Sequence, residues 1–206
     1  TTLKGIPAAP GIAIGKAILF DSEEISIPRR SITEDQVPYE MLRLEEALIK
    51  TRHQILAIQR KLSQELGSEH AEILNAHLLV LEDQSVREEI INGLRGQKQN
   101  VEAIFNDVLH RHLKAFARTE DEYLRERAAD IEDIRKRVLR NLLGKQPDAL
   151  KRLDQAGILV AHDLSPSETA QMHKRNVVGF VTDIGGRTSH TAIMAKSLAI
   201  PAVVGV

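Results

Sequence analysis

A histidine follows two glycines near the carboxyl end of the chain, in the run Gly185-Gly186-Arg187-Thr188-Ser189-His190. The glycines permit positive φ and a close approach of the backbone. Apolar residues before the run predict a strand, and residues 191 to 198 predict a helix, so His190 is expected in or beside the first helical turn. A helix N-terminus presents unpaired N–H groups and a partial positive charge, which together bind phosphate oxygens. Because imidazole is a nucleophile, the pattern predicts covalent phosphoryl transfer through His190.

Polar neighbours of this histidine favour the same chemistry. Arg187 is a cation that can bind a phosphoryl group through two donors, and Thr188, Ser189 and Thr191 supply hydroxyls. Two other interpretations are open at this point, because a lone histidine at a helix start is often a capping or half-buried polar residue. Gly-Gly before Ser or Thr also occurs in nucleotide loops, although the glycine-to-lysine spacing of a Walker A loop is absent.

The overall composition sets limits on the class of protein. Of the 206 residues, 42% are apolar and 28% are charged, with a formal net charge of −1, so no global field attracts nucleic acid or a membrane surface. The chain has no cysteine, which excludes disulfides and cysteine nucleophiles. No apolar run approaches the roughly 18 residues of a membrane span, and the first residues do not have the pattern of a secretion signal. We expect a cytoplasmic globular protein with no nucleic-acid partner, no membrane partner and no metal site.

The elements that position His190 are of two kinds. A strand is predicted over residues 12–19, and residues 33–144 carry apolar side chains at steps of three and four, which predicts helices joined by short turns. After Pro147, strands over 158–161, 177–181 and 201–206 alternate with helix starts at Pro166 and Thr191, which predicts an α/β unit. The predicted breaks and caps of the helical part are Thr33 with Gln36, Gly67, Asp83 to Ser85, Asn100, Thr119 with Glu122, and Gly144.

We therefore predict an α/β domain made of residues 1–32 and 145–206, with a helical subdomain inserted over residues 33–144. The stretch GGRTSHTAIMAKSLAIPAVVGV, which starts at Gly185, resembles the phosphohistidine signature of the phosphoenolpyruvate-utilising enzymes. That family includes enzyme I of the sugar phosphotransferase system, phosphoenolpyruvate synthase and pyruvate phosphate dikinase. The stretches KGIPAAPGIAIGKA, DEYLRERAADI and DLSPSETAQ resemble the enzyme I branch in particular, so the resemblance covers nearly the whole chain in the right order.

The resemblance implies a fold and an activity. The implied fold is an α/β swivelling phosphohistidine domain with an inserted antiparallel helical bundle. The implied activity is that of a phosphoenolpyruvate-protein phosphotransferase, in which His190 passes phosphate from phosphoenolpyruvate to the active histidine of the small carrier protein HPr. Two alternatives are a module of a multiphosphoryl transfer protein that serves fructose or dihydroxyacetone, and a non-catalytic domain that only docks a carrier. The intact run ending in His190 argues against the second.

The resemblance also assigns roles to individual residues. His190 matches the phospho-acceptor, and Thr169 matches a threonine whose hydroxyl is expected to hydrogen-bond the resting imidazole. The contact of Arg187 with phosphate is inferred from its chemistry and its place in the signature. His77 matches a residue on the HPr-binding face. The residues expected on that face are Glu69, Ile73, His77, Val80, Val86 and Arg127.

Further parts of the implied machinery have no counterpart in this sequence. In the family a C-terminal barrel binds phosphoenolpyruvate and Mg²⁺ and provides the dimer contacts. We therefore expect no cofactor in this chain, with Mg²⁺ needed only by the barrel. We also expect a monomer for this stretch and a homodimer for the full-length protein.

Overall fold

The computed structural model describes residues 2–20, 25–117, 122–145, 156–169, 172, 176–186 and 189–206. By their contacts the residues form two compact units, which are described separately. The sheet unit comprises Thr1–Glu23, Ile58–Leu74 and Pro147–Val206, and the bundle unit comprises Glu24–Ala57 and Asn75–Gln146. The sheet unit thus includes a helical stretch that lies inside the predicted 33–144 insertion, and the predicted domain boundaries stay a prediction.

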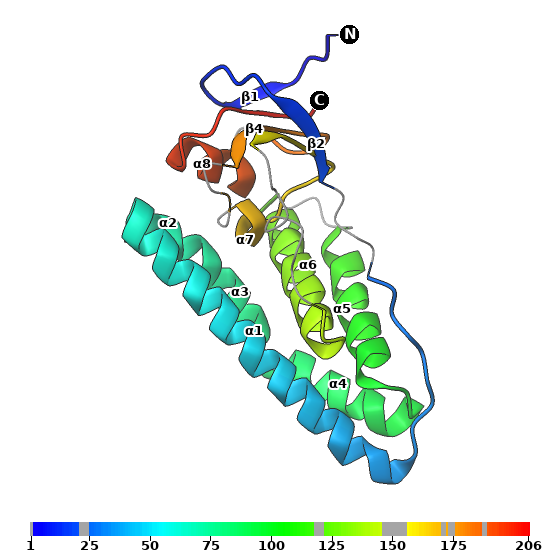
Figure 1. The fold of residues 1–206 in the computed structure, drawn as a ribbon. Helices are drawn as coiled ribbons and strands as arrows, with labels where there is room; N and C mark the ends of the chain where they lie inside the picture. Colours follow the sequence, from blue (N-terminus) through cyan, green and yellow to red (C-terminus); the bar gives the residue numbers. More distant parts are fainter. Residues whose placement is uncertain are drawn as a thin grey trace. The chain divides into compact units, whose positions relative to one another are not determined.

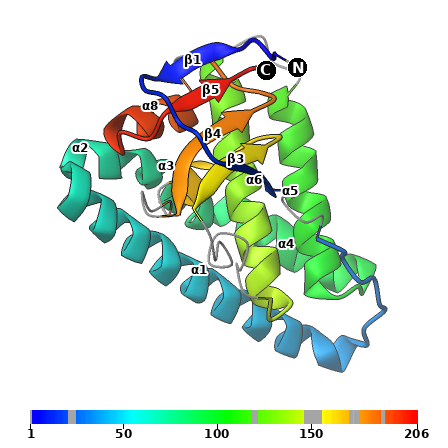
Figure 2. The ribbon, with the colours of Figure 1, turned by 45° about the horizontal axis from the view of Figure 1, so that its top comes forward.

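The sheet unit is built on one five-stranded sheet in the order β1-β5-β4-β3-β2. The antiparallel pair is β1 with β5, and the other three pairings are parallel. Figure 2 shows β1, β5, β4 and β3 side by side. Because parallel neighbours need a crossover, the chain leaves the sheet after β2, β3 and β4 and returns each time in the same direction. The strands are β1 (Ile6–Ala9), β2 (Lys16–Phe20), β3 (Gly157–Ala161), β4 (Val177–Thr182) and β5 (Ala202–Val204).

The prediction of one strand over residues 12–19 is correct only for its second half, where β2 covers residues 16–20. Residues 12–15 lie outside any strand and follow Gly11, which has φ +134°, and Ile12 and Ile14 are each 92% exposed; the other strand of this segment, β1, precedes them. The apolar run therefore does not mark a buried strand. Strand β1 contains Pro7, which an edge strand tolerates because its N–H side need not enter the ladder.

Short helices follow the strands of the sheet unit. Helix α8 contacts β1 and β5, and α7 contacts both α8 and η2. The buried core includes Phe180 of β4, Leu159 of β3 and Met194 of α8. The helices of this unit are α2 (Ser68–Ala71), η2 (Glu72–Leu74), α7 (Pro166–Thr169) and α8 (His190–Ser197). The predicted alternation of strands and helices after Pro147 is confirmed.

The bundle unit consists of long helices, of which α5 and α6 lie alongside each other (Figure 1). Helix α4 packs on α5, and α3 packs on α6. Fully buried apolar residues such as Leu94, Ile104 and Leu139 fall on the predicted three- and four-residue steps. The helices are η1 (Glu34–Gln36), α1 (Val37–Leu66), α3 (Asn75–Leu81), α4 (Gln84–Gln97), α5 (Val101–Ala117) and α6 (Glu122–Leu142), and α1 continues into the sheet unit beyond Ala57.

Most predicted caps are found where the sequence placed them. Gly67 separates α1 from α2 at φ +96°, and Gly144 ends α6 at φ +66° with the Lys145 N–H bonded to the Arg140 carbonyl. Asp83 caps α4 by accepting hydrogen bonds from the backbone of Ser85 and Val86. The predicted capping box of Thr119 with Glu122 begins outside the described residues.

The start of α5 is capped by a different residue from the one predicted. Asn100 occupies the expected position, but its side-chain oxygen accepts from Arg30 N, and its amide donates to the Pro28 carbonyl and to Glu102. The carboxylate of Glu40, in the first turn of α1 and 61 residues earlier in the sequence, accepts from Val101 N at 2.8 Å. The helix start is therefore satisfied by a long-range contact that no local pattern reveals.

Two buried glutamates share one arginine at this point. Arg43 donates to Glu40 at 2.8 Å and also bonds Glu102, and both carboxylates are at most 3% exposed. Burial alone would raise the pKa of Glu102, but hydrogen bonds from Arg43 and Asn100 outweigh that effect and lower it below its ordinary value. Both glutamates therefore belong to a charge-paired network that links α1 to α5.

The lowered pKa of Glu102 makes the stability of the bundle depend on acidity. Because the folded-state pKa lies below the unfolded one, the stabilisation is fully present above about pH 4.5 and is lost as the pH falls through the folded value. We expect the free energy of unfolding to fall steeply below that pH. Replacing Glu102 by glutamine should cost about 1–3 kcal/mol at neutral pH and flatten the acid limb. Urea unfolding followed by circular dichroism between pH 3 and 7 checks this, and equal acid slopes in both proteins would contradict it.

Candidate functional site

Helix α8 begins at His190 itself. Ser189 is its cap: the Ser189 hydroxyl oxygen accepts from Ala192 N at 3.2 Å, and the hydroxyl donates to the Gly186 carbonyl at 2.9 Å. His190 is half-buried. The first residue of a helix lies among the unpaired N–H groups of the first turn, where an anion is stabilised. The predicted place of His190 at a helix start is confirmed, and its chemical role stays a prediction.

The loop that leads to His190 is fixed at its beginning. The Thr182 hydroxyl, at the end of β4, donates to the Ile184 carbonyl at 2.7 Å. Gly185 follows with φ +123°, a conformation that side chains rarely adopt, and Ser189 N closes a turn onto the Gly186 carbonyl. The glycine is needed because a Cβ here would also lie 3.2 Å from Cβ of Val204.

Alanine at Gly185 should therefore disturb this loop, whereas alanine at Gly186 should not. The first substitution combines positive φ with a tight contact to β5, and we expect a cost of about 1–3 kcal/mol in unfolding free energy. A Cβ on Gly186 meets no atom of the described residues within 4 Å, and its φ is not positive. Chemical denaturation of the two variants gives the comparison, and equal stabilities would show that the loop does not require the glycine conformation.

Thr169 lies at the end of α7 and is completely buried. Its hydroxyl donates to the Ser165 carbonyl at 2.9 Å, which leaves the oxygen able to accept. Ser165 and Glu168 form a reciprocal capping box that orders this short helix. Helix α7 contacts α8, but no hydrogen bond joins Thr169 to His190 among the described residues, so that predicted contact stays a prediction.

The start of α8 makes a further hydrogen bond that the sequence did not reveal. The Thr191 hydroxyl, buried beside His190, donates to the Leu164 carbonyl at 2.7 Å. This bond connects α8 to the loop that leads to α7 and Thr169. Arg187, the predicted phosphate-binding cation, lies outside the described residues together with Thr188.

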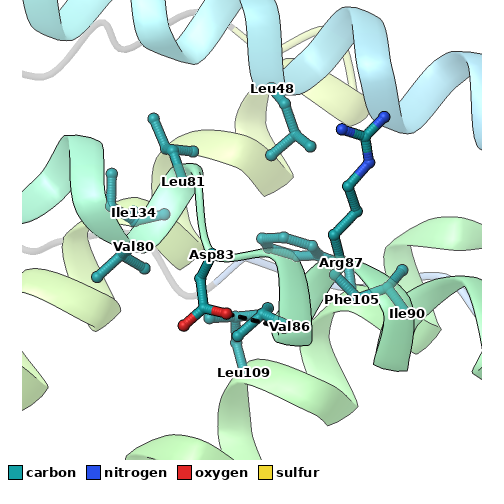
Figure 3. A pocket seen from close by; sticks show the side chains of 10 residues that line it. All are labelled: Leu48, Val80, Leu81, Asp83, Val86, Arg87, Ile90, Phe105, Leu109 and Ile134. Atoms are coloured by element: carbon teal, nitrogen blue, oxygen red, sulfur yellow. Dashed lines mark hydrogen bonds between the residues drawn. The ribbon is translucent and has the colours of Figure 1, made fainter.

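Two of the predicted carrier contacts, Val80 and Val86, line one small hollow of the bundle unit (Figure 3). The hollow has a volume of about 20 Å³, room for about one water molecule, and its walls are almost entirely apolar. Asp83 stands beside it and caps α4 through Val86 N. The other lining residues are Leu48, Leu81, Arg87, Ile90, Phe105, Leu109 and Ile134.

His77 has a different environment from the one predicted. It is completely buried on α3, where Nε2 lies 3.0 Å from a carboxylate oxygen of Asp133 and Nδ1 lies 3.7 Å from Asp130. Both aspartates belong to α6 and are themselves buried. The structure therefore gives His77 a role in joining α3 to α6, and a direct contact with a partner stays a prediction that its burial does not favour.

The other predicted contacts that the structure describes belong to the sheet unit. Glu69 is exposed on α2 and Ile73 is half-buried in η2, whereas Val80 and Val86 belong to the bundle unit. The side chain of Arg127 lies outside the described residues. Among the residues that the structure describes, no group of three or more His, Asp or Glu is placed to hold a metal ion. Within the same ranges, no helix combines the length and apolar character needed to cross a membrane.

Comparison with known proteins identifies the family to which this architecture belongs. Residues 4–127 match the family described as PEP-utilising enzyme, N-terminal, and residues 153–206 match PEP-utilising enzyme, mobile domain. The chain therefore belongs to the phosphoenolpyruvate-utilising enzymes, and the predicted family and fold class are confirmed.

Particular relatives point to one branch of that family. A protein of Haemophilus influenzae named Phosphoenolpyruvate-protein phosphotransferase is 44% identical over 98% of this chain, and one of Listeria innocua with the same name is 45% identical over 98%. The chain spans 35% of the length of each. A solution structure of Enzyme I (nEIt) is 43% identical, with a TM-score of 0.76 over 99% of this chain and 82% of that one. The N-terminal domain of Enzyme 1 - Nitrogen is 27% identical, with a TM-score of 0.65 over 98% and 82%.

Proposed function

We propose that this chain relays a phosphoryl group through His190, between phosphoenolpyruvate chemistry in the full-length protein and an HPr-type carrier. The observation that carries the proposal is the position of His190, which is half-buried as the first residue of α8. It follows the loop that contains Gly185 and Gly186, called the glycine loop. A nucleophile at a helix N-terminus faces the donors that a phosphoryl group needs. The similarity to proteins named phosphoenolpyruvate-protein phosphotransferase supports the same chemistry.

The transfer itself is an exchange of one bond to phosphorus for another. A ring nitrogen of His190 attacks the phosphorus as the bond to the donor atom breaks, and the phosphoryl group passes without oxidation or reduction. Charge spreads over the three equatorial oxygens, where the N–H groups at the start of α8 stabilise it. Arg187 is proposed as a second source of positive charge. Transfer to HPr is the reverse exchange, with the carrier's histidine as nucleophile.

The partner is proposed to dock on the bundle. The apolar rim formed by Val80 and Val86 is proposed to contact an apolar patch of the carrier, and docking would supply the proximity that the in-line reaction requires. The resemblance assigns Mg²⁺ to a further domain, and the step proposed for this chain is described through His190, Arg187 and the N–H groups at the start of α8. The cytoplasmic location, and dimerisation of the full-length protein, are proposed on the same resemblance.

Phosphate uptake from HPr phosphorylated on its histidine tests the relay. We expect intact mass at neutral pH to show one added phosphoryl group, which mild acid removes because a phosphoramidate bond is acid-labile. Unphosphorylated HPr serves as the control. A folded chain that takes up no phosphate would contradict the relay.

A parallel reaction with phosphoenolpyruvate alone tests whether this chain can accept phosphate without the further domain. We expect no labelling, because phosphoenolpyruvate and Mg²⁺ are expected to bind in the further domain. Rapid labelling without any carrier protein would show that this stretch takes phosphate directly.

A further inference from the structure

An exposed imidazole–carboxylate pair lies where two parallel strands end. His162 follows β3 and Asp183 follows β4, and His162 Nδ1 lies 3.0 Å from Asp183 Oδ2. The side chains are 75% and 62% exposed. Because Ala161 is in register with Thr182, the next residue on each strand emerges side by side at the same edge of the sheet.

The backbone continues the sheet ladder through this pair. Asp183 N donates to the Ala161 carbonyl and Ile184 N donates to the His162 carbonyl, both at 3.2 Å. Beyond Ile184 come Gly185 and Gly186, which have no side chains to fix the loop. The Thr182 hydroxyl bonds the Ile184 carbonyl within the loop after β4, whereas the His162–Asp183 pair joins that loop to the loop after β3, just before the glycines that lead to His190.

The two loops that start at this pair carry the residues of the proposed relay. The loop after β3 leads through Leu164 to α7 and Thr169, and the loop after β4 leads to α8 and His190. Further along both segments, the Thr191 hydroxyl in the first turn of α8 donates to the Leu164 carbonyl at 2.7 Å. The pair and this bond thus connect the same two loops at their two ends.

We propose that His162 and Asp183 are positioning residues, which hold the glycine loop against the loop after β3 and so raise the rate at which His190 accepts a phosphoryl group. The inference rests on the proposed relay through His190. An exposed hydrogen-bonded pair contributes little to global stability, so its effect on loop order can be separated from an effect on folding. Neither side chain is expected to touch phosphate.

Single-turnover uptake from phosphorylated HPr, measured over a range of donor concentrations, tests the pair. We expect His162→Ala to lower the maximal rate by about threefold to fivefold, with the half-saturating donor concentration unchanged and the Tm shifted by less than about 2 °C. His162→Asn keeps a donor close to the position of Nδ1 and should restore most of the rate. Asp183→Ala removes the acceptor and should slow uptake like His162→Ala, and the double variant should be no slower than either. The exposed His53, on α1 in the bundle unit, gives the control His53→Ala, which should behave as the parent.

Amide hydrogen exchange at Ile184 gives a readout independent of transfer. Faster exchange in His162→Ala than in the parent is expected, because the amide loses the support of the pair. If the parent takes up no phosphate, the proposed relay through His190 is contradicted. The exchange result then still tests whether the His162–Asp183 pair orders the loop. The proposal would be overturned if His162→Ala kept the parental rate and the parental amide exchange. It would also be overturned if the rate loss came with a large fall in Tm and His162→Asn did not restore the rate.

Discussion

Replacing His190 by alanine is expected to abolish phosphate uptake from phosphorylated HPr while the chain stays folded. The covalent bond to phosphorus needs a ring nitrogen, so the loss should be at least about a thousandfold. Because His190 is half-buried at the first position of α8 and the cap is supplied by Ser189, little stability should be lost. Intact mass gives the uptake, and circular dichroism gives the fold.

Two further measurements make this result specific. His110 is an exposed histidine on α5, so His110→Ala should take up phosphate like the parent. Titration calorimetry with unphosphorylated HPr should give the same affinity for His190→Ala as for the parent, because the docking surface is proposed on the bundle. Undiminished uptake by His190→Ala would place the phosphoryl group on another residue. Docking by the parent without any uptake would instead favour a domain that only binds the carrier.

Replacing His77 by alanine is expected to give the largest loss of stability in the bundle. The imidazole is completely buried, its Nε2 lies 3.0 Å from Asp133, and its Nδ1 faces Asp130. Removing it takes a buried partner from one carboxylate and leaves two acidic side chains on adjacent turns of α6 without the intervening ring. Losing this buried hydrogen bond and leaving the space of the ring unfilled should together cost about 2–5 kcal/mol. Urea unfolding at neutral pH measures the loss.

The neighbouring variants separate the pair from simple loss of volume. Asp133→Asn keeps the size of the side chain and a possible hydrogen bond, so it should cost less than His77→Ala. In the double variant the two costs should not add, because both changes act on the same contact. A cost below about 1 kcal/mol for His77→Ala would contradict the buried pairing, since ordinary surface changes are smaller than this.

The helices were predictable because their pattern is long and repeats. Apolar residues at three- and four-residue steps, such as Leu44, Ile55 and Leu62 of α1, are the ones that the fold buries. Glycines 67 and 144 end helices through positive φ, which is a local property of the residue. Such features depend on neighbours in the sequence, so the sequence alone is enough to place them.

The wrong predictions concern features that depend on contacts between residues far apart in the sequence. Ile12 and Ile14 form an apolar run like that of a strand, yet whether they are covered depends on distant parts of the chain. Asn100 has the chemistry of a helix cap, but Glu40 reaches Val101 N across a long separation in sequence and takes that role. Composition near these residues does not contain that information.

The candidate site divides in the same way. The glycines and the helix start that place His190 are local, and the sequence predicted them. The Thr191 bond to Leu164 and the pairing of His162 with Asp183 join segments that are far apart in sequence, and no motif indicated them. Burial of His77 against α6 was missed for the same reason, because a histidine on a helix shows no sign of which neighbour it faces.

The parallel pairing of β2 with β3 has a consequence for how the protein folds. Lys16 pairs with Gly157, and the whole bundle unit lies between them in the sequence, while β1 pairs with β5 from near the two ends of the chain. Closing such long loops costs conformational entropy before native contacts can compensate for it. Helical hairpins close over short separations in sequence and therefore form faster. We expect the helices to form early and to bring the distant strands together. The loop that presents His190 would then acquire its geometry only in the last step of folding, when the sheet is complete.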